Sequence, residues 1–245
     1  MSRRRGKRLG IFWRFALALV ALAALAAGAL MVYPPVGRLA KDNPGETAFM
    51  HHAVDEAASK GRKLTINQQW VSLGRISPYL VRAVLIGEDD RFYTHEGFDF
   101  DAMQKAIERD IKAGKLKAGG STISQQLAKN LYLSRSKNPF RKLVEAVITW
   151  RLERALSKRR ILEIYLNVIE WGDGIYGSEA AARHYYGKHA SELSAMEAAR
   201  LAAVIPNPIR FNPLGQSRYV ENRARIIYGV MERRGIVEEG YEDSE

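Results

Sequence analysis

Apolar residues form one uninterrupted stretch near the amino terminus and recur at helical spacing farther along the chain. Residues 15–33 contain no charged side chain, and an α-helix of these 19 residues extends about 28 Å, which is close to the thickness of a bilayer's hydrocarbon core. Six Lys or Arg residues and no acid lie within 1–14, so this flank is expected to stay in the cytoplasm. The pattern predicts a basic cytoplasmic segment at 1–14 and a transmembrane signal-anchor at 15–33, with a cleavable signal peptide as the alternative.

The stretch that follows has weak periodicity and turn-forming residues. Residues 34–64 include Pro34, Pro35, Pro44 and Gly45, which favour loops and turns. We expect this segment to be a stalk that leads into the folded part, with a short strand after it within 64–73.

Helix-start signals are frequent from Ser77 onward. Proline follows a candidate N-cap residue twice, and two capping boxes place a glutamine or glutamate three residues after a hydroxyl side chain. The signals are Ser77-Pro78, Asn138-Pro139, Thr122 with Gln125, and Ser194 with Glu197. The fold class expected from this pattern is mainly α.

The helical part forms one domain in this interpretation. The run 140–167 predicts two helices with a break near 157–160, and about 216–235 predicts a final basic helix. We expect the domain to cover 65–235 and an acidic tail to cover 236–245.

Charge and cysteine content exclude some functions. The chain has no cysteine, which excludes disulfides and cysteine catalysis. The formal net charge is +11, and within 112–160 the only acids are Glu145 and Glu153 among 13 bases. Such a surplus favours a polyanionic partner: nucleic acid, an anionic membrane surface or a phosphorylated substrate. Export of the chain beyond residue 36 or so weighs against nucleic acid.

Two glutamates fall on apolar helix faces. Glu88 shares a face with Val81 and Val84, and Glu145 lies on the apolar line of its own predicted helix. A buried, unpaired carboxylate is unfavourable, so each needs a partner or a raised pKa. One interpretation is a buried salt bridge for each, since Arg141 precedes Glu145 by one turn and Arg82 precedes Glu88 by six residues. The other is catalysis: burial at a helix end raises the pKa of Glu88, as a general base near neutral pH requires.

The segment 119–130 predicts an unusually polar helix face, made by Thr122, Gln125, Gln126, Lys129 and Asn130. Free N–H groups at a helix start favour an anion, and amide and hydroxyl side chains suit sugars and phosphates. The alternative is a solvated surface helix. We favour a face that binds a phosphorylated, hydroxyl-rich ligand.

These residues also carry a family resemblance. "EDDRFYTHEG" (88–97), "GGSTISQQLAKN" (119–130) and "RKLVE" (141–145) resemble the first three motifs of the peptidoglycan glycosyltransferases. "RRILEIYLN" (159–167) and two later segments, 176–188 and 193–208, are similar to the closing motifs. The likeness covers about 65–215, with the motifs in order. Lys137 stands where the family usually has arginine, and Tyr186 where phenylalanine is usual.

The resemblance implies a lysozyme-like fold and an enzyme that polymerises lipid II with inversion, releasing undecaprenyl pyrophosphate. By motif match, Glu88 is the expected general base, and Glu145 a second essential carboxylate that orients substrate or a divalent cation. Residues expected to bind the substrate and its pyrophosphate are Ser121, Thr122, Gln126, Lys129, Lys137, Arg141 and Lys142. Supporting motif residues are Asp89, Phe92, His95, Gly97, Gln125 and Asn130.

The implied setting is the inner membrane, with a single span, a cytoplasmic amino terminus and a periplasmic catalytic domain. Expected partners are lipid II, the growing glycan strand, the membrane and other cell-wall synthesis proteins, without nucleic acid. No cofactor is required, although Mg²⁺ or Mn²⁺ near Glu145 would assist the leaving group. Two alternatives stay open at this point: a murein-cleaving lysozyme-like enzyme, and an inactive membrane-anchored scaffold that binds glycolipid.

Overall fold

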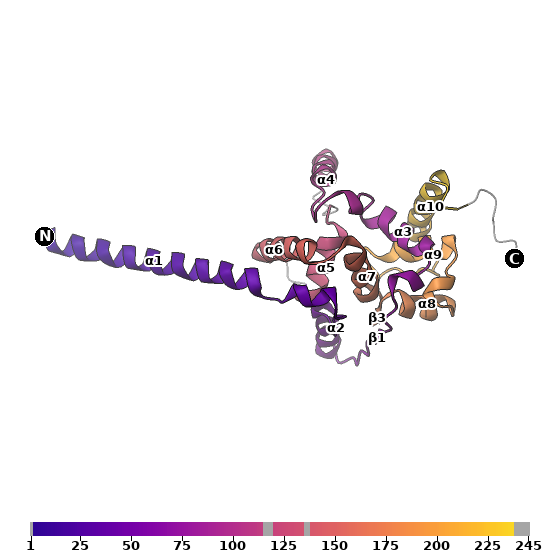
Figure 1. Cartoon of the computed structure of the whole chain (residues 1–245), viewed down its shortest axis with the longest axis horizontal. Coiled ribbons are helices and arrows are strands. Elements are labelled where there is room, and N and C mark those ends of the chain that lie inside the picture. Colours follow the sequence, from indigo (N-terminus) through magenta and orange to yellow (C-terminus); the bar gives the residue numbers. More distant parts are fainter. Residues whose placement is uncertain (1, 115–119, 135–137, 238–245) are drawn as a thin grey trace.

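The computed structural model describes residues 2–114, 120–134 and 138–237. Lys137 and the acidic tail from residue 238 lie outside these described residues. Helices dominate the described part and confirm the predicted mainly α class (Figure 1).

In the described residues, three short strands interrupt a series of helices. The α-helices are α1 (Ser2–Val32), α2 (Ala48–Ser59), α3 (Pro78–Glu88), α4 (Phe100–Ala113), α5 (Ile123–Tyr132), α6 (Pro139–Ala155), α7 (Lys158–Val168), α8 (Ser178–Tyr186), α9 (Ala195–Val204) and α10 (Arg218–Arg233). Short 3-10 helices are η1 (Val36–Ala40), η2 (Leu73–Arg75), η3 (Phe92–Thr94) and η4 (Ala190–Glu192), and the strands are β1 (Asn67–Gln68), β2 (Glu170–Gly172) and β3 (Ile175–Tyr176).

One apolar core joins two groups of helices. Helix α9 packs against both α3 and α10, and α5 packs against α6 and α7. Leu80 of α3, Leu127 of α5 and Leu201 of α9 are fully buried in this core. Complete burial of one such side chain contributes about 1.5–3 kcal/mol, so these contacts fix how the helix ends meet.

The small sheet has the order β1-β3-β2, with β1 parallel to β3 and β2 antiparallel to it. The strand expected within 64–73 is only two residues long. Three residues beyond its end, the Asn167 side-chain amide accepts from the Val71 N–H at 2.9 Å and donates to the Val71 carbonyl at 2.9 Å. A side chain thus takes the backbone groups that a neighbouring strand would pair.

Three of the four predicted N-caps form. Thr122 and Ser194 cap α5 and α9 through the predicted capping boxes, and Asn138 caps α6. Ser77 precedes α3 but its hydroxyl makes no cap; it donates to the Leu193 carbonyl at 2.9 Å. The break in the run 140–167 lies between α6 and α7.

The predicted stalk contains structure that the sequence pattern did not indicate. Helix α2 packs against α5, and Met50 on its inner side is fully buried. Thr47 caps this helix by accepting from the Met50 N–H at 3.2 Å. Part of 34–64 therefore supports the helix that carries the polar motif.

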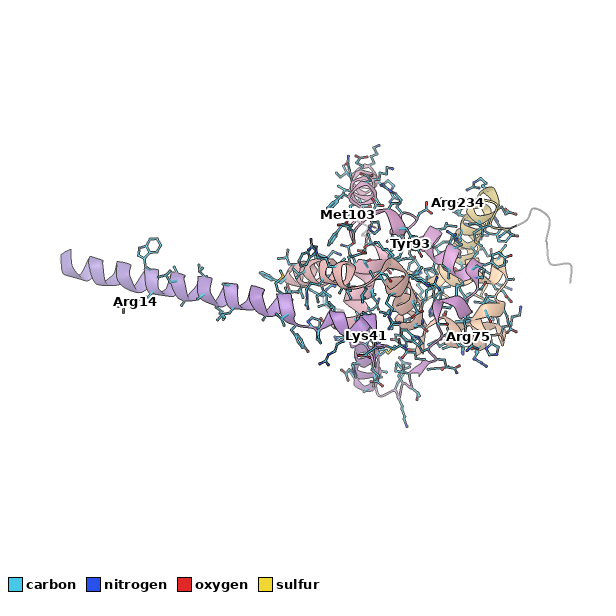
Figure 2. All side chains as sticks on the ribbon, viewed as in Figure 1. Arg14, Lys41, Arg75, Tyr93, Met103 and Arg234 are labelled. Carbon is cyan, nitrogen blue, oxygen red and sulfur yellow. The ribbon has the colours of Figure 1, made fainter. Side chains whose placement is uncertain are left out.

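Helix α1 projects from the domain, and Arg14 lies on its projecting part, away from the other elements (Figures 1 and 2). Its carboxyl end is attached to α6 through Arg151, which donates to the carbonyls of Leu30 (2.9 Å), Val32 (2.8 Å) and Pro34 (2.7 Å). Among the residues whose placement the structure describes, no helix combines the length and apolar character that crossing a membrane requires. The span predicted at 15–33 stays a prediction.

Candidate active site

A cleft of about 820 Å³ lies where α3 ends and α5 and α6 begin, with residues from α10 and from the end of α9 on its other wall. Glu88 and Glu145 both line it, although they come from different helices. The structure therefore brings together the two glutamates that the helical pattern singles out.

Glu88 is the last residue of α3, and its side chain is only 10% exposed. Its Oε2 accepts from Gln126 Nε2 at 2.9 Å, and its Oε1 accepts from Arg223 Nη2 at 2.8 Å. Burial raises the pKa of Glu88 above its ordinary value, while the bonds from Gln126 and Arg223 oppose that rise. These two donors fix the orientation of the carboxylate, and a buried carboxylate with a raised pKa has the properties that a general base requires.

The orientation of Gln126 is itself fixed. Its Oε1 accepts from the hydroxyl of Tyr165 on α7 at 2.9 Å, which leaves the amide nitrogen to face Glu88. Burial, and then the nearby Glu88 carboxylate, raises the pKa of Tyr165 well above its ordinary value. The hydroxyl therefore keeps its proton and remains a donor at physiological pH.

Glu145 is 3% exposed and has a different environment. Its Oε2 accepts from Arg141 Nη1 at 3.0 Å, and its Oε1 accepts from Lys142 Nζ. The salt bridge to Arg141 considered from the sequence is confirmed. Lys142 also lies 3.4 Å from the Ser121 hydroxyl and its side chain is half exposed, so Glu145 holds cations that still face the cleft.

The polar face predicted on α5 is only partly directed at the cleft. Gln126 and Lys129 line it, and Lys129 Nζ also lies 5.4 Å from the centre of the Phe49 ring. Asn130 instead donates its amide to the Gln126 backbone carbonyl at 2.8 Å. The helix is not a solvated surface helix, since Ser124, Gln125 and Asn130 are among its buried residues.

Thr122 and Gln125 build the start of α5. The Thr122 hydroxyl accepts from the Gln125 N–H at 3.2 Å and donates to the Gly97 carbonyl at 2.6 Å. The Gln125 side chain in turn accepts from the Thr122 N–H at 3.0 Å. Both residues border the cleft but are buried, so their contacts serve the helix start rather than a freely exposed binding face.

Asp89 connects the first two motifs. Its Oδ2 accepts from the N–H of Ile123, the first residue of α5, at 2.9 Å. Its Oδ1 contacts His95 Nε2 at 2.9 Å. His95 Nδ1 accepts from the Gly97 N–H at 3.1 Å. His95 therefore has a structural position, and Phe92 beside it is completely buried.

At Gly97, the backbone conformation and the surrounding side chains leave no room for a larger residue. Its φ is +90°, and a Cβ there would lie 3.0 Å from the side chains of Thr149 and Glu153. A glycine is needed here because the chain turns in close contact with α6.

Two residues of this site escaped the sequence reasoning: Arg223 and Tyr165. The pattern predicts that α10 is basic, but nothing local distinguishes Arg223 from Arg218 or Arg225 on the same helix. The contact of Arg223 with Glu88 joins residues 135 positions apart. Only the packing of α10 beside α3 reveals it.

The cleft therefore has two chemically distinct parts. Glu88 provides a buried proton acceptor at the end of α3, and Lys129, Arg141 and Lys142 provide cations on α5 and α6. This combination suits removal of a proton from one reactant while negative charge develops on another.

Comparison with known proteins agrees with this geometry. Residues 56–232 match the family described as Transglycosylase. A biosynthetic peptidoglycan transglycosylase of Methylobacillus flagellatus is 50% identical over 217 residues, which cover 89% of this chain and 94% of that protein. A protein of the same name from Dechloromonas aromatica is 55% identical over 189 residues, covering 77% of this chain and 82% of its own. The chain therefore belongs to the transglycosylase family.

Proposed function

We propose that this protein polymerises lipid II into β-1,4-linked glycan strands with inversion and release of undecaprenyl pyrophosphate. Its family membership makes it a peptidoglycan glycosyltransferase of cell-wall synthesis. The observation that carries the finer assignment is the cleft itself, where a buried carboxylate with a raised pKa accompanies the cations Lys129, Arg141 and Lys142.

Glu88 is the general base in this proposal. It takes the proton from the 4-hydroxyl of the acceptor's GlcNAc as that oxygen bonds to the anomeric carbon of the donor's MurNAc. The bond from that carbon to the phosphate oxygen breaks, and the pyrophosphate leaves with the electron pair. The raised pKa of Glu88 supports this role, because a base is most effective when its pKa approaches the working pH.

The cations stabilise the leaving group. Pyrophosphate departs as an anion, so it needs positive charge more than it needs a proton. Lys129, Arg141 and Lys142 line the cleft, and the Ser121 hydroxyl lies beside Lys142. We expect Lys137, which lies outside the described residues, to add to this set.

Glu145 positions those cations. Both of its oxygens already accept hydrogen bonds from Arg141 and Lys142, so this carboxylate does not present a free ligand for Mg²⁺ or Mn²⁺. The residues that the structure describes contain no group of three or more His, Cys, Asp or Glu side chains suited to holding a metal ion. The donor set does not fit a protein-bound cation, and the proposal includes no step through one.

We place the protein on the inner membrane, anchored through α1, with its catalytic domain periplasmic. Leu17, Leu19, Leu22 and Leu25 are each at least 65% exposed. At 100° per residue they point to different sides of α1, which is typical of a helix surrounded by lipid. A membrane-confined substrate such as lipid II suits an enzyme held at the same surface.

The proposal is tested with purified full-length protein in detergent, given fluorescent lipid II or preformed glycan. We expect a ladder of glycan chains from lipid II and no cutting of preformed glycan. Cleavage of glycan with lipid II left intact would establish the hydrolase alternative instead. Binding of lipid II without any product would establish the scaffold.

A further inference from the structure

Arg223 has a specific connection to the candidate base. A single nitrogen, Nη2, donates to Glu88 Oε1 at 2.8 Å and to the Gly87 carbonyl at 2.8 Å. The guanidinium therefore holds the carboxylate against the last turn of α3. Its side chain is 28% exposed and lines the cleft, so the contact lies at the site and not behind it.

The position of Arg223 leaves one of its hydrogen-bond donors unsatisfied. Its Nε is buried and, within the part of the chain that the structure describes, has no hydrogen-bond partner. A buried donor without an acceptor is unfavourable, and native proteins retain few of them. An arginine kept in this position despite that penalty indicates a role for its contact with Glu88.

Several charged or titratable groups face Glu88 from the elements around it. Arg223 comes from α10, Lys129 from α5 and Tyr165 from α7, whereas the adjacent Asp89 carboxylate contacts His95 and the Ile123 N–H instead. Lys129 acts on Glu88 through space and Tyr165 acts through Gln126, whereas Arg223 forms an ion pair with the carboxylate. Arg223 is therefore the cation best placed to decide how Glu88 is oriented and charged.

We infer that Arg223 is the positioning residue of the catalytic base: it holds one carboxylate oxygen in place and keeps Glu88 ionised between transfers. This inference rests on the proposed function. Each transfer moves the acceptor hydroxyl's proton onto Glu88, which must then lose it to water before the next sugar is added. A cation in contact with the carboxyl group favours that loss.

The inference is tested by measuring the initial rate of lipid II polymerisation against pH for the wild type and three variants. Arg223→Gln removes the charge, Arg223→Lys retains it, and Arg225→Gln is the matched control on the exposed side of α10. Circular dichroism checks that each variant is folded.

The expected shift has a definite sign. A general base works only when ionised, so the rate falls as pH drops through the pKa of Glu88. Loss of Arg223 removes an interaction that lowers this pKa, so the acid limb of Arg223→Gln moves to higher pH by about 1 unit or more. Arg223→Lys moves by less, and Arg225→Gln keeps the wild-type profile.

A different pattern would overturn the inference. An Arg223→Gln enzyme with reduced rate at every pH but an unchanged acid midpoint would show that Arg223 is merely structural, as would a raised KM with the same pH profile. If Arg223→Gln does not fold, the uncharged variant Arg223→Met replaces it, and an unshifted acid limb in that variant counts equally against the inference. If the wild type itself does not polymerise lipid II, the proposed function fails. This outcome is distinguishable from failure of the inference, because it does not depend on any Arg223 variant.

Discussion

Glu88 and Glu145 are both buried, yet their contacts suit them to different tasks. Glu88 has one cationic donor and one amide donor, and burial raises its pKa. Glu145 accepts from Arg141 and Lys142, so its charge is compensated on both oxygens. The first arrangement favours proton transfer and the second favours holding cations in place.

Tyr186 allows a test of packing at the residue scale. Its hydroxyl is buried and has no hydrogen-bond partner among the described residues, and burial raises its pKa. Tyr186→Phe removes this unpaired group, so we expect the free energy of unfolding to increase by about 1 kcal/mol. Urea denaturation measures the change.

Tyr176→Phe is the matched control for that prediction. The Tyr176 hydroxyl donates to Glu170 Oε1 at 3.0 Å, and its loss is expected to lower stability. Equal destabilisation by the two substitutions would contradict the account of Tyr186.

Residue-level prediction from the sequence succeeds where the relevant contacts are close along the chain. Arg141 pairs with Glu145 four residues later, as helical spacing indicates. For Glu88 the nearby sequence offers Arg82 as a partner, but the cation that binds it is Arg223, which no local pattern identifies. Periodicity gives the buried face of a helix; it does not give the identity of a distant partner.

The first turn of α5 is the element on which the candidate site depends. Thr122 caps the helix and is bonded to Gly97, while Asp89 accepts from the Ile123 N–H. These contacts connect the motif at 88–97 with the motif at 119–130. Gln126 and Lys129 then follow on the wall of the cleft.

Thr122→Ala tests this view of α5. Loss of an N-cap hydroxyl lowers stability by about 1–2 kcal/mol, and the polymerisation rate falls because Gln126 and Lys129 lose their fixed positions. Thr122→Ser keeps the hydroxyl and is expected to retain most of the stability. The measurements are urea denaturation and polymerisation of lipid II.

Unchanged stability in Thr122→Ala, together with weakened lipid II binding, would contradict this assignment. It would show that Thr122 contacts the substrate directly, as the sequence resemblance implies.

Element boundaries are predictable where a local signal exists. Capping boxes locate the starts of α5 and α9, and proline locates the first residues of α3 and α6. Helix α2 is not predicted because its segment shows weak periodicity, and its stability comes from packing on α5. Strand β1 lies within the predicted 64–73 but is only two residues long, and beyond it the Asn167 side chain pairs with the backbone groups of Val71.

At the scale of the whole molecule, α6 links the projecting helix to the cleft. Arg151 binds the carboxyl end of α1, and Glu145, Arg141 and Lys142 lie on the same helix as Arg151. A cation at a helix carboxyl end is favourable because backbone carbonyls there lack helical partners. The direction of α1 is therefore coupled to the element that carries Arg141 and Lys142.

The sequence indicates the family and the mainly α fold, but not how the helices assemble around the cleft. The motifs lie in order between about 65 and 215, whereas α10 contributes Arg223 from beyond that range. The packing of α9 against both α3 and α10, which also contact each other, places this arginine beside Glu88. Such an arrangement depends on contacts between distant segments, which a single sequence does not reveal.

Whether Glu88 is the base for glycan polymerisation is tested by comparing wild type with Glu88→Gln, for chain formation and for lipid II binding. The substitution keeps the size of the side chain but removes the proton acceptor, so we expect the rate to fall by about a hundredfold or more while lipid II still binds. Chain formation by Glu88→Gln at close to the wild-type rate would contradict the claim.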